Sequence, residues 1–216
     1  MSARWLLAAP ALLFAGSALA ADAAPKWVEG KNYTVIEPAQ PTLTPGKVEV
    51  VEVFSYACPH CHDFVPFADK IRASLPDYAS FQSVPAGFSF TAWRTFQRGY
   101  FAAQALGVAD KAHDALFSAV FDKRSISGTD PTLDDLAKFY AAYGVKPDEF
   151  LATANSFGIN AKIKRANERI KAWGVTGTPT LIVNGKYSLS VGSAGGFAQT
   201  VELVDWLVAR EHAATP

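Results

Sequence analysis

The sequence has only two cysteines in 216 residues, and they lie close together as Cys58 and Cys61. A disulfide that closes so short a loop stabilises a fold by only about 2 kcal/mol, because it restricts the unfolded chain very little. Such a pair does not join distant segments of a structure. We therefore interpret Cys58 and Cys61 as a disulfide that opens and closes during a reaction.

The chain also lacks an excess of charge of either sign, since 20 basic residues balance 20 acidic ones. Proteins that bind nucleic acids usually carry a basic patch. The one basic cluster lies between residues 162 and 171, and helical spacing distributes it around a solvated face. Its members are Lys162, Lys164, Arg165, Arg169 and Lys171. We therefore expect no nucleic-acid partner.

Beyond its N-terminus the sequence has no apolar run that approaches the roughly 20 residues needed to span a bilayer. The run from Trp5 to Ala21 has 17 residues, follows Arg4 and ends near the small residues Ala18 and Ala20. This pattern is typical of a secretory signal peptide. We predict that residues 1–20 are a signal peptide cleaved after Ala20, which leaves a soluble product. An uncleaved membrane anchor is the alternative, and the short run disfavours it.

The remaining sequence predicts an α/β fold. The β-branched run from Val48 to Phe54 has no clean alternation, as in a central strand buried on both faces. A helix is expected from Pro59 to Pro76 and a second strand at 81–84. Strand signals then return at 180–183 and at Lys186-Tyr187, on either side of the hairpin signal Asn184-Gly185, and an amphipathic helix follows at 197–210.

Between residues 91 and 173 the pattern is helical throughout. Glycine and proline divide it into predicted helices at 91–106, 110–121, 133–143, 148–157 and 161–173, the last division being at Gly158. The two outer segments can close one sheet, with the helices as a cap. We therefore assign 21–90 and 170–216 to one domain and 91–169 to an inserted all-helical domain.

The positions of the two cysteines suit thiol-disulfide exchange, which needs one sulfur that is ionised near neutral pH. Cys58 stands at the predicted helix start, with Pro59 at the first helical position, and free N–H groups there stabilise a thiolate. Cys61 follows nearly one turn later on the same face. We assign Cys58 as the attacking thiol and Cys61 as the resolving thiol. His60 adds a donor and a positive charge that lower the Cys58 pKa.

The ionisation of Cys58 links the redox state of the pair to the stability of the fold. A depressed pKa stabilises the reduced form by about 1.4 kcal/mol for each unit between that pKa and the working pH. The disulfide opposes this with about 2 kcal/mol. The sequence therefore predicts that the reduced form is the more stable at pH 7, if the Cys58 pKa lies about two or more units below pH 7.

The histidines near the cysteines leave other interpretations open. Cys58, His60, Cys61 and His62 supply ligand types for zinc, but a structural zinc site usually draws its ligands from two separated pairs. We therefore expect no metal. His60 can also be a solvated loop residue, and we interpret the remaining histidines as solvated. These are His62, His113 and His212.

Glu52 is an anomaly, because a carboxylate within an apolar strand is costly unless it has a partner or a task. If its side chain points beneath the helix that follows Cys58, burial raises its pKa, and it can exchange a proton with Cys61. Alternatively Glu52, like Glu49, reaches solvent near a strand end. The strand pattern by itself leaves both alternatives open.

Together these residues resemble the DsbA family of periplasmic dithiol oxidases, and the similarity extends from Lys26 to Arg210. The matching motifs are Phe54-Ser55-Tyr56-Ala57-Cys58-Pro59-His60-Cys61, Ala105-Leu106-Gly107-Val108, Gly177-Thr178-Pro179-Thr180 and Val183-Asn184-Gly185-Lys186-Tyr187. The resemblance implies a thioredoxin-like fold, a central β-sheet flanked by helices, with an inserted helical domain. It also implies that Glu52 is a buried acid and that a cis peptide bond at Pro179 faces the disulfide.

A cis bond at Pro179 would expose the backbone of Thr178 beside Cys58. A substrate peptide could pair with that backbone in extended form, so we expect Thr178 and Pro179 to bind substrate. Thr178 is also a departure from the best-known family members, which carry valine there, whereas related disulfide isomerases often carry threonine. The resemblance therefore leaves the redox poise open.

The leading hypothesis is a periplasmic oxidase that donates the Cys58–Cys61 disulfide to unfolded exported proteins with reduced cysteines. The resemblance implies reoxidation by a membrane partner of the DsbB type, and we expect a monomer with no cofactor besides the disulfide. An isomerase or reductase is the alternative. These usually carry a further domain, and the 27 residues between Ala20 and Val48 are too few for one. A binding module that does not need its cysteines is a third class.

Overall fold

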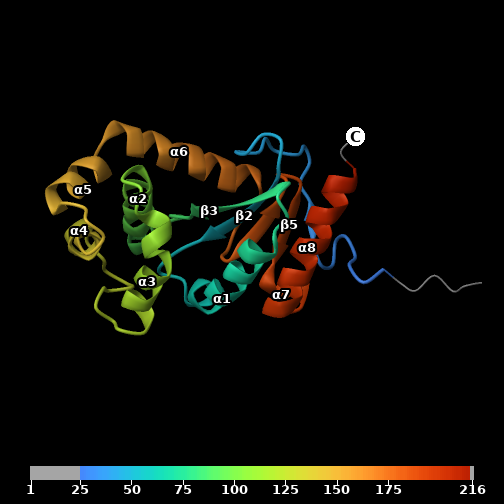
Figure 1. Cartoon of the computed structure of the whole chain (residues 1–216), viewed down its shortest axis with the longest axis horizontal. Helices are drawn as coiled ribbons and strands as arrows, with labels where there is room; N and C mark the ends of the chain where they lie inside the picture. Colours follow the sequence, from blue (N-terminus) through green and yellow to red (C-terminus); the bar gives the residue numbers. More distant parts are fainter. Residues whose placement is uncertain (1–24, 215–216) are drawn as a thin grey trace, which may run out of the picture.

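The computed structural model describes residues 25–214, so the predicted signal peptide and its cleavage after Ala20 lie outside the described residues. It confirms the predicted α/β fold with a helical insertion (Figure 1). Five strands form one sheet in the order β1-β5-β4-β2-β3. They are β1 Thr34–Val35, β2 Val48–Phe54, β3 Ala79–Pro85, β4 Thr180–Val183 and β5 Tyr187–Ser190.

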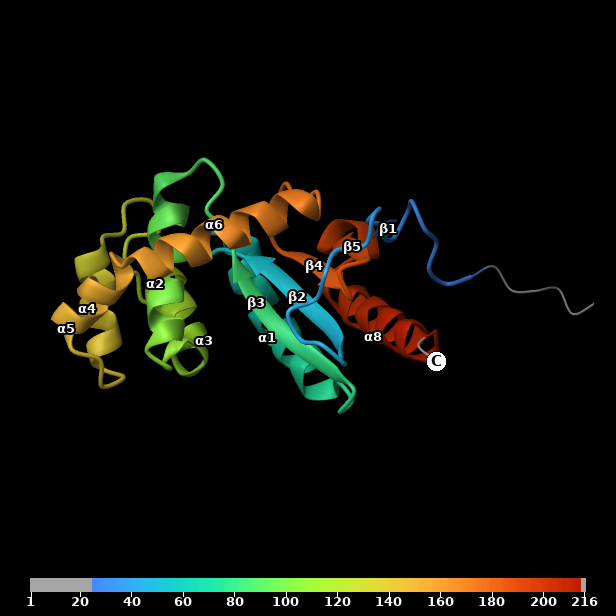
Figure 2. The ribbon, with the colours of Figure 1, turned by 90° about the horizontal axis from the view of Figure 1, so that it is seen from above.

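Strand β2 is central and buried along its whole length, as its apolar run predicts. It pairs in parallel with β3 and antiparallel with β4, so that Glu52 lies between Ser83 and Leu181. Val48 and Val50 pack toward the helices α1 (Pro59–Ser74) and α8 (Phe197–Ala213). Val51 and Val53 belong to a second hydrophobic cluster, which the helices between β3 and β4 help to form. Of these helices, α6 (Phe157–Ala172) crosses the opposite face of the sheet (Figure 2).

The turn between β4 and β5 confirms the predicted hairpin. Asn184 and Gly185 both have positive φ angles, of 53° and 64°, as a two-residue hairpin turn requires. The turn also packs closely against the loop that precedes β2, where the Gln40 N–H donates to the Gly185 carbonyl at 2.8 Å. A Cβ atom on Gly185 would lie only 2.0 Å from the Gln40 carbonyl oxygen, so glycine is required there.

Five helices connect β3 to β4 and form a lobe beside the sheet (Figures 1 and 2). They are α2 Thr91–Ala105, α3 Ala109–Phe121, α4 Leu133–Ala141, α5 Pro147–Ala154 and α6 Phe157–Ala172. The predicted division at Gly158 is wrong, because α6 already begins at Phe157. The Ser156 hydroxyl caps it by accepting a hydrogen bond from the Ile159 N–H at 3.3 Å. The sequence also missed β1 and the one-turn helix α7, Val191–Ala194, which are too short for a periodic signal.

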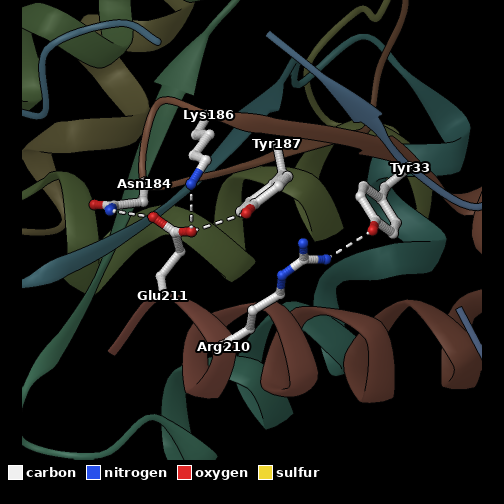
Figure 3. Close-up of polar contacts among 6 residues, drawn as sticks. All are labelled: Tyr33, Asn184, Lys186, Tyr187, Arg210 and Glu211. Carbon is white, nitrogen blue, oxygen red and sulfur yellow. Dashed lines mark hydrogen bonds and ion pairs between the residues drawn. The ribbon is translucent and has the colours of Figure 1, made fainter. Parts of the chain in front are cut away.

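The end of α8 is fastened to the β4–β5 hairpin by Glu211, whose side chain is buried (Figure 3). Its carboxylate accepts hydrogen bonds from Asn184 at 2.9 Å, Lys186 at 3.0 Å and Tyr187 at 2.9 Å. Burial raises the pKa of Glu211, but these three hydrogen bonds outweigh it and hold the pKa below its usual value. The neighbouring Arg210 donates to the Tyr33 hydroxyl at 2.9 Å.

We expect Glu211→Gln to lower the free energy of unfolding at pH 7 by about 1 kcal/mol, because the charged acceptor is lost. A depressed carboxyl pKa stabilises the fold above its unfolded value, and this contribution disappears as the pH falls through the folded pKa. The loss should therefore be smaller at pH 3 than at pH 7 in denaturant melts. Glu202→Gln, at an exposed site on the same helix, is the control. An equal loss at both pH values would contradict the ionic role of Glu211.

Candidate active site

Cys58 and Cys61 lie where β2 passes into α1, as the sequence predicts. Cys58 is the residue before the first helical position, with an extended backbone, and its N–H donates to the Ser55 carbonyl at 3.0 Å. Pro59 begins the helix. The Cys61 N–H donates to the Cys58 carbonyl at 3.1 Å. Cys58 keeps 5% of its surface exposed and Cys61 none, so only Cys58 faces an incoming thiol.

The two sulfurs are not bonded to each other in this structure, and as thiols they differ strongly in ionisation. A hydrogen bond from the Cys61 thiol is the largest influence that lowers the Cys58 pKa, which falls to about 6. Burial opposes this shift, while Thr178 and the backbone N–H groups of Cys61 and His60 add to it. Burial raises the pKa of Cys61 well above its ordinary value. At neutral pH the thiolate is therefore on Cys58 and the thiol proton on Cys61.

Pro59 and His60 form the exposed surface between the two sulfurs. His60 acts on Cys58 through its backbone N–H, which lowers the Cys58 pKa. A serine at this position would keep that N–H. Replacement of His60 therefore isolates the effect of the imidazole side chain.

We expect His60→Ser to raise the Cys58 pKa by up to about one unit and to make the disulfide less oxidising. The reason is the loss of the imidazole, a hydrogen-bond donor beside the thiolate. Alkylation rates measured against pH give the pKa, and a glutathione titration gives the potential. Unchanged values would mean that His60 acts through its backbone alone and that its side chain is solvated.

Thr178 and Pro179 come from a loop that follows α6, and the tertiary fold places them against Cys58. The Thr178–Pro179 peptide bond is cis, as the resemblance implies. When it is protonated, the Cys58 thiol donates to the Thr178 carbonyl at 3.5 Å, across 120 positions of sequence. The Thr178 side chain lies close enough to both sulfurs to lower their pKa values.

Glu52 lies beneath the active-site helix, so the buried alternative is confirmed and the solvated alternative is wrong. Only 2% of its surface is exposed, and burial raises its pKa to about 8. Arg72 opposes this shift, whereas the negative charges of Asp69, Cys58 and Asp114 add to it. Glu52 in turn raises the pKa of Cys61. A buried acid with this pKa can exchange a proton with the buried thiol.

Glu49 is also buried, so the expectation that it reaches solvent is wrong as well. One of its carboxylate oxygens accepts hydrogen bonds from the Leu43 N–H at 2.7 Å and the Thr44 hydroxyl at 3.2 Å. It lies on the opposite face of β2 from Glu52 and serves to hold the loop before the strand. The two carboxylates of β2 therefore have different roles.

The prediction that His113 is solvated is wrong, because only 9% of its surface is exposed. Its Nδ1 atom is 2.8 Å from the hydroxyl of Tyr56, which belongs to the active-site motif. Burial, assisted by Arg72, lowers its pKa to about 4, so the imidazole is neutral at pH 7. A sequence signal for this burial existed, because His113 shares helical spacing with the apolar Ala109 and Leu116.

His62 is half-buried against the helical insertion rather than solvated. Its ring stacks on Phe121 with 5.0 Å between centroids, and its Nε2 atom is 3.3 Å from an Asp122 carboxylate oxygen. His212 is exposed and stacks on Tyr78. Within residues 25–214 no group of three or more histidine, cysteine or acidic side chains is placed to hold a metal ion. In the same part of the chain, no helix has the length and apolar character needed to cross a membrane.

Comparisons with known proteins agree with this geometry. The DSBA-like thioredoxin domain family matches residues 49–198. The thiol:disulfide interchange protein DsbA of Pseudomonas syringae is 39% identical over 196 residues, covering 91% of this chain and 90% of the relative. Pseudomonas aeruginosa DsbA has a crystal structure that superposes with a TM-score of 0.81 at 37% identity, covering 88% of this chain and 97% of that one. For the oxidoreductase DsbA from Xylella fastidiosa the TM-score is 0.83 at 38% identity, with coverage of 88% and 100%.

Proposed function

The chain belongs to the DsbA family of thiol-disulfide oxidoreductases, and from this we propose that it is a periplasmic dithiol oxidase that introduces disulfide bonds into exported proteins. The observation that carries the proposal is the difference in ionisation between its two sulfurs. A Cys58 pKa of about 6 makes the Cys58 thiolate a good leaving group, so a mixed disulfide at Cys58 readily passes on to the substrate. A cysteine with so low a pKa favours transfer of the disulfide to the substrate over its retention in the enzyme.

The reaction begins when a substrate thiolate attacks the Cys58 sulfur of the disulfide. A bond forms between the substrate and Cys58, and the bond to Cys61 breaks, which leaves the electron pair on Cys61. A second substrate thiolate then attacks the substrate sulfur, and Cys58 leaves as a thiolate. The substrate loses two electrons and gains a disulfide, and the enzyme ends in the dithiol form.

Glu52 supplies the proton that the first step requires. The Cys61 thiolate is formed in a buried site where its pKa lies well above the ordinary value, so it must be protonated at once. Glu52 is protonated at pH 7, because its pKa is about 8, and it donates to Cys61. In reoxidation the proton returns from Cys61 to the Glu52 carboxylate.

Thr178 and Pro179 position the substrate. The Thr178 carbonyl lies within 3.5 Å of the Cys58 sulfur, and the adjoining backbone offers groups for an extended peptide to pair with. Pairing there would align the substrate cysteine with Cys58. The substrates are unfolded exported proteins with reduced cysteines, whose chains are extended enough to bind in this way.

The cellular setting completes the proposal. A signal peptide cleaved after Ala20 delivers the protein to the periplasm, where it acts as a monomer. A membrane protein of the DsbB type restores the Cys58–Cys61 disulfide. The family membership and the N-terminal sequence support these statements.

Refolding of reduced ribonuclease tests the activity. The oxidised protein should restore ribonuclease activity stoichiometrically, and Cys58→Ala should not. Equal activity of both would favour a binding module. A glutathione titration then separates an oxidase from an isomerase or reductase, because an isomerase or reductase would have the more reducing potential. A potential in that range would retain the exchange chemistry and overturn the oxidase proposal.

A further inference from the structure

A cleft of about 490 Å³ opens between the active-site helix, the free edge of β3 and the helical insertion. Its mouth is charged, and its floor includes polar side chains that are more deeply buried. Asp69 and Arg72 of α1 and Asp110 and Asp114 of α3 line the mouth, and Ser83, Tyr100 and His113 line the floor.

Glu52 lies directly behind this floor. Ser83 is its register partner in β3, and the Tyr100 hydroxyl donates to the Ser83 carbonyl at 3.2 Å. The charge of Glu52 contributes to the raised pKa of Tyr100. Conversely, Arg72, Asp69 and Asp114 all influence the pKa of Glu52, and each of them lines the mouth. Apart from Cys58, the charged groups that shift the Glu52 pKa therefore all line the cleft.

The proposed reaction requires Glu52 to exchange its proton with solvent in every cycle. The side toward the sulfurs gives no access, because Cys61 is fully buried. One carboxylate oxygen of Glu52 is buried and has no hydrogen-bond partner among the described residues. An unpartnered buried oxygen needs an ordered water or a proton carrier nearby, and the cleft is the adjacent space that can hold water.

We propose that this cleft is the route by which Glu52 exchanges protons with solvent, and that the Asp114 carboxylate carries the proton at its mouth. The inference rests on the proposed role of Glu52 toward Cys61. During reoxidation Cys61 gives its proton to the Glu52 carboxylate and forms the bond to Cys58. The proton then passes from Glu52 through water in the cleft to Asp114, and from there to bulk solvent.

Asp114 is suited to this position. Its side chain is exposed, and it lines both the cleft and a second cavity of about 310 Å³ beside α1. Burial and Asp69 raise its pKa, while Arg72 lowers it. A carboxylate is a far stronger base than water, so it accepts a proton from a neutral buried acid more readily than water does.

Other titratable groups face Asp114 from every element packed around it. Asp69 and Arg72 of α1 lie on the cleft side, and His62 and Asp63 of α1 with Asp122 line the second cavity. Tyr100 of α2 and the α3 residues Asp110 and His113 complete the cleft. Asp110 is the matched control, because it is an exposed carboxylate on the same helix and cleft but is not among the charges that act on Glu52.

Stopped-flow oxidation of the reduced protein by the aromatic disulfide DTNB tests the route. Cys58 attacks first and releases one thionitrobenzoate anion, and Cys61 then loses its proton, attacks Cys58 and releases a second. We expect Asp114→Asn to leave the first phase unchanged and to slow the second phase roughly tenfold at pH 7. Asp110→Asn should change neither phase, and added formate should restore the second phase of Asp114→Asn.

The sign of the effect separates a proton route from simple electrostatics. Asp114 raises the pKa of Glu52, so its removal would leave more Glu52 carboxylate at pH 7 and, by charge alone, speed the second phase. A second phase of Asp114→Asn that is equal or faster, or a slow phase that formate does not restore, would overturn the route. If the parent protein releases no second anion, Cys61 is not the resolving thiol, and the proposed function fails together with the route.

Discussion

Cys61→Ala is expected to hold substrates on Cys58 as mixed disulfides while turnover falls by about 10³-fold or more. Cys58 remains the exposed sulfur in this variant, so it can still form a bond with a substrate cysteine. Loss of Cys61 prevents the internal attack that would release that substrate. The variant has no disulfide of its own, so Cys58 is first converted by DTNB to a mixed disulfide with thionitrobenzoate. A substrate thiolate then attacks the Cys58 sulfur, and thionitrobenzoate leaves. Non-reducing gels of this form mixed with reduced exported proteins should show adducts that disappear on reduction.

Cys58→Ala is the matched control for this trapping experiment. Its remaining thiol is Cys61, which is fully buried and holds its proton at neutral pH. A thiol in that state is neither accessible nor nucleophilic, so we expect no adducts. Adducts recovered from Cys58→Ala rather than from Cys61→Ala would reverse the roles of the two sulfurs. The Cys61→Ala variant also lacks the hydrogen bond from Cys61 that lowers the Cys58 pKa. Trapping is therefore best measured at pH 8 as well as at pH 7.

The oxidised and reduced forms are expected to exchange their order of stability near pH 7.5. The Cys58 pKa falls from an ordinary value of 9.0 to about 6 in the folded protein. This depression stabilises the reduced form by about 1.4 kcal/mol at pH 7 and about 2.7 kcal/mol at pH 8. The stabilisation is lost as the pH falls through the folded pKa of Cys58.

The disulfide opposes this effect, because it stabilises the oxidised form by about 2 kcal/mol. The sequence predicts a more stable reduced form at pH 7 only if the Cys58 pKa lies about two units below that pH. A Cys58 pKa of about 6 lies only about one unit below pH 7, so we expect the oxidised form to be slightly more stable than the reduced form at pH 7. The raised pKa of Cys61 destabilises the reduced form, but this effect becomes significant only as the pH approaches the ordinary thiol pKa.

Denaturant melts of both redox forms at pH 6, 7 and 8 provide the measurement. The difference between the forms should move by roughly 2 kcal/mol in favour of the reduced protein from pH 6 to pH 8. Reduced Cys58→Ser is the control, because serine does not ionise and should remove most of that pH dependence. A difference that stays constant over this range would show that Cys58 is not the low-pKa thiol.

Several features were predictable because they depend on neighbouring residues. The β-branched run at Val48–Phe54 determines a buried strand, and Pro59 at the first helical position determines where α1 begins. Asn184 and Gly185 adopt the positive φ angles of the hairpin because of their own residue types. The reacting sulfurs and their order along the helix follow from the same local rules, so the sequence by itself determined the chemistry.

Other features were decided only by the tertiary structure. The sequence left Glu52 between a buried and a solvated position, and the packing of α1 over β2 resolved this and raised its pKa to about 8. The sequence predicts that His62 and His113 are solvated, whereas the packing of α3 against α1 and Tyr56 buries them wholly or in part. Thr178 reaches Cys58 across 120 positions, and the cleft in front of Glu52 is lined by residues of α1, β3, α2 and α3. Burial and charge interactions depend on distances between segments far apart in the chain, and a one-dimensional pattern does not contain those distances.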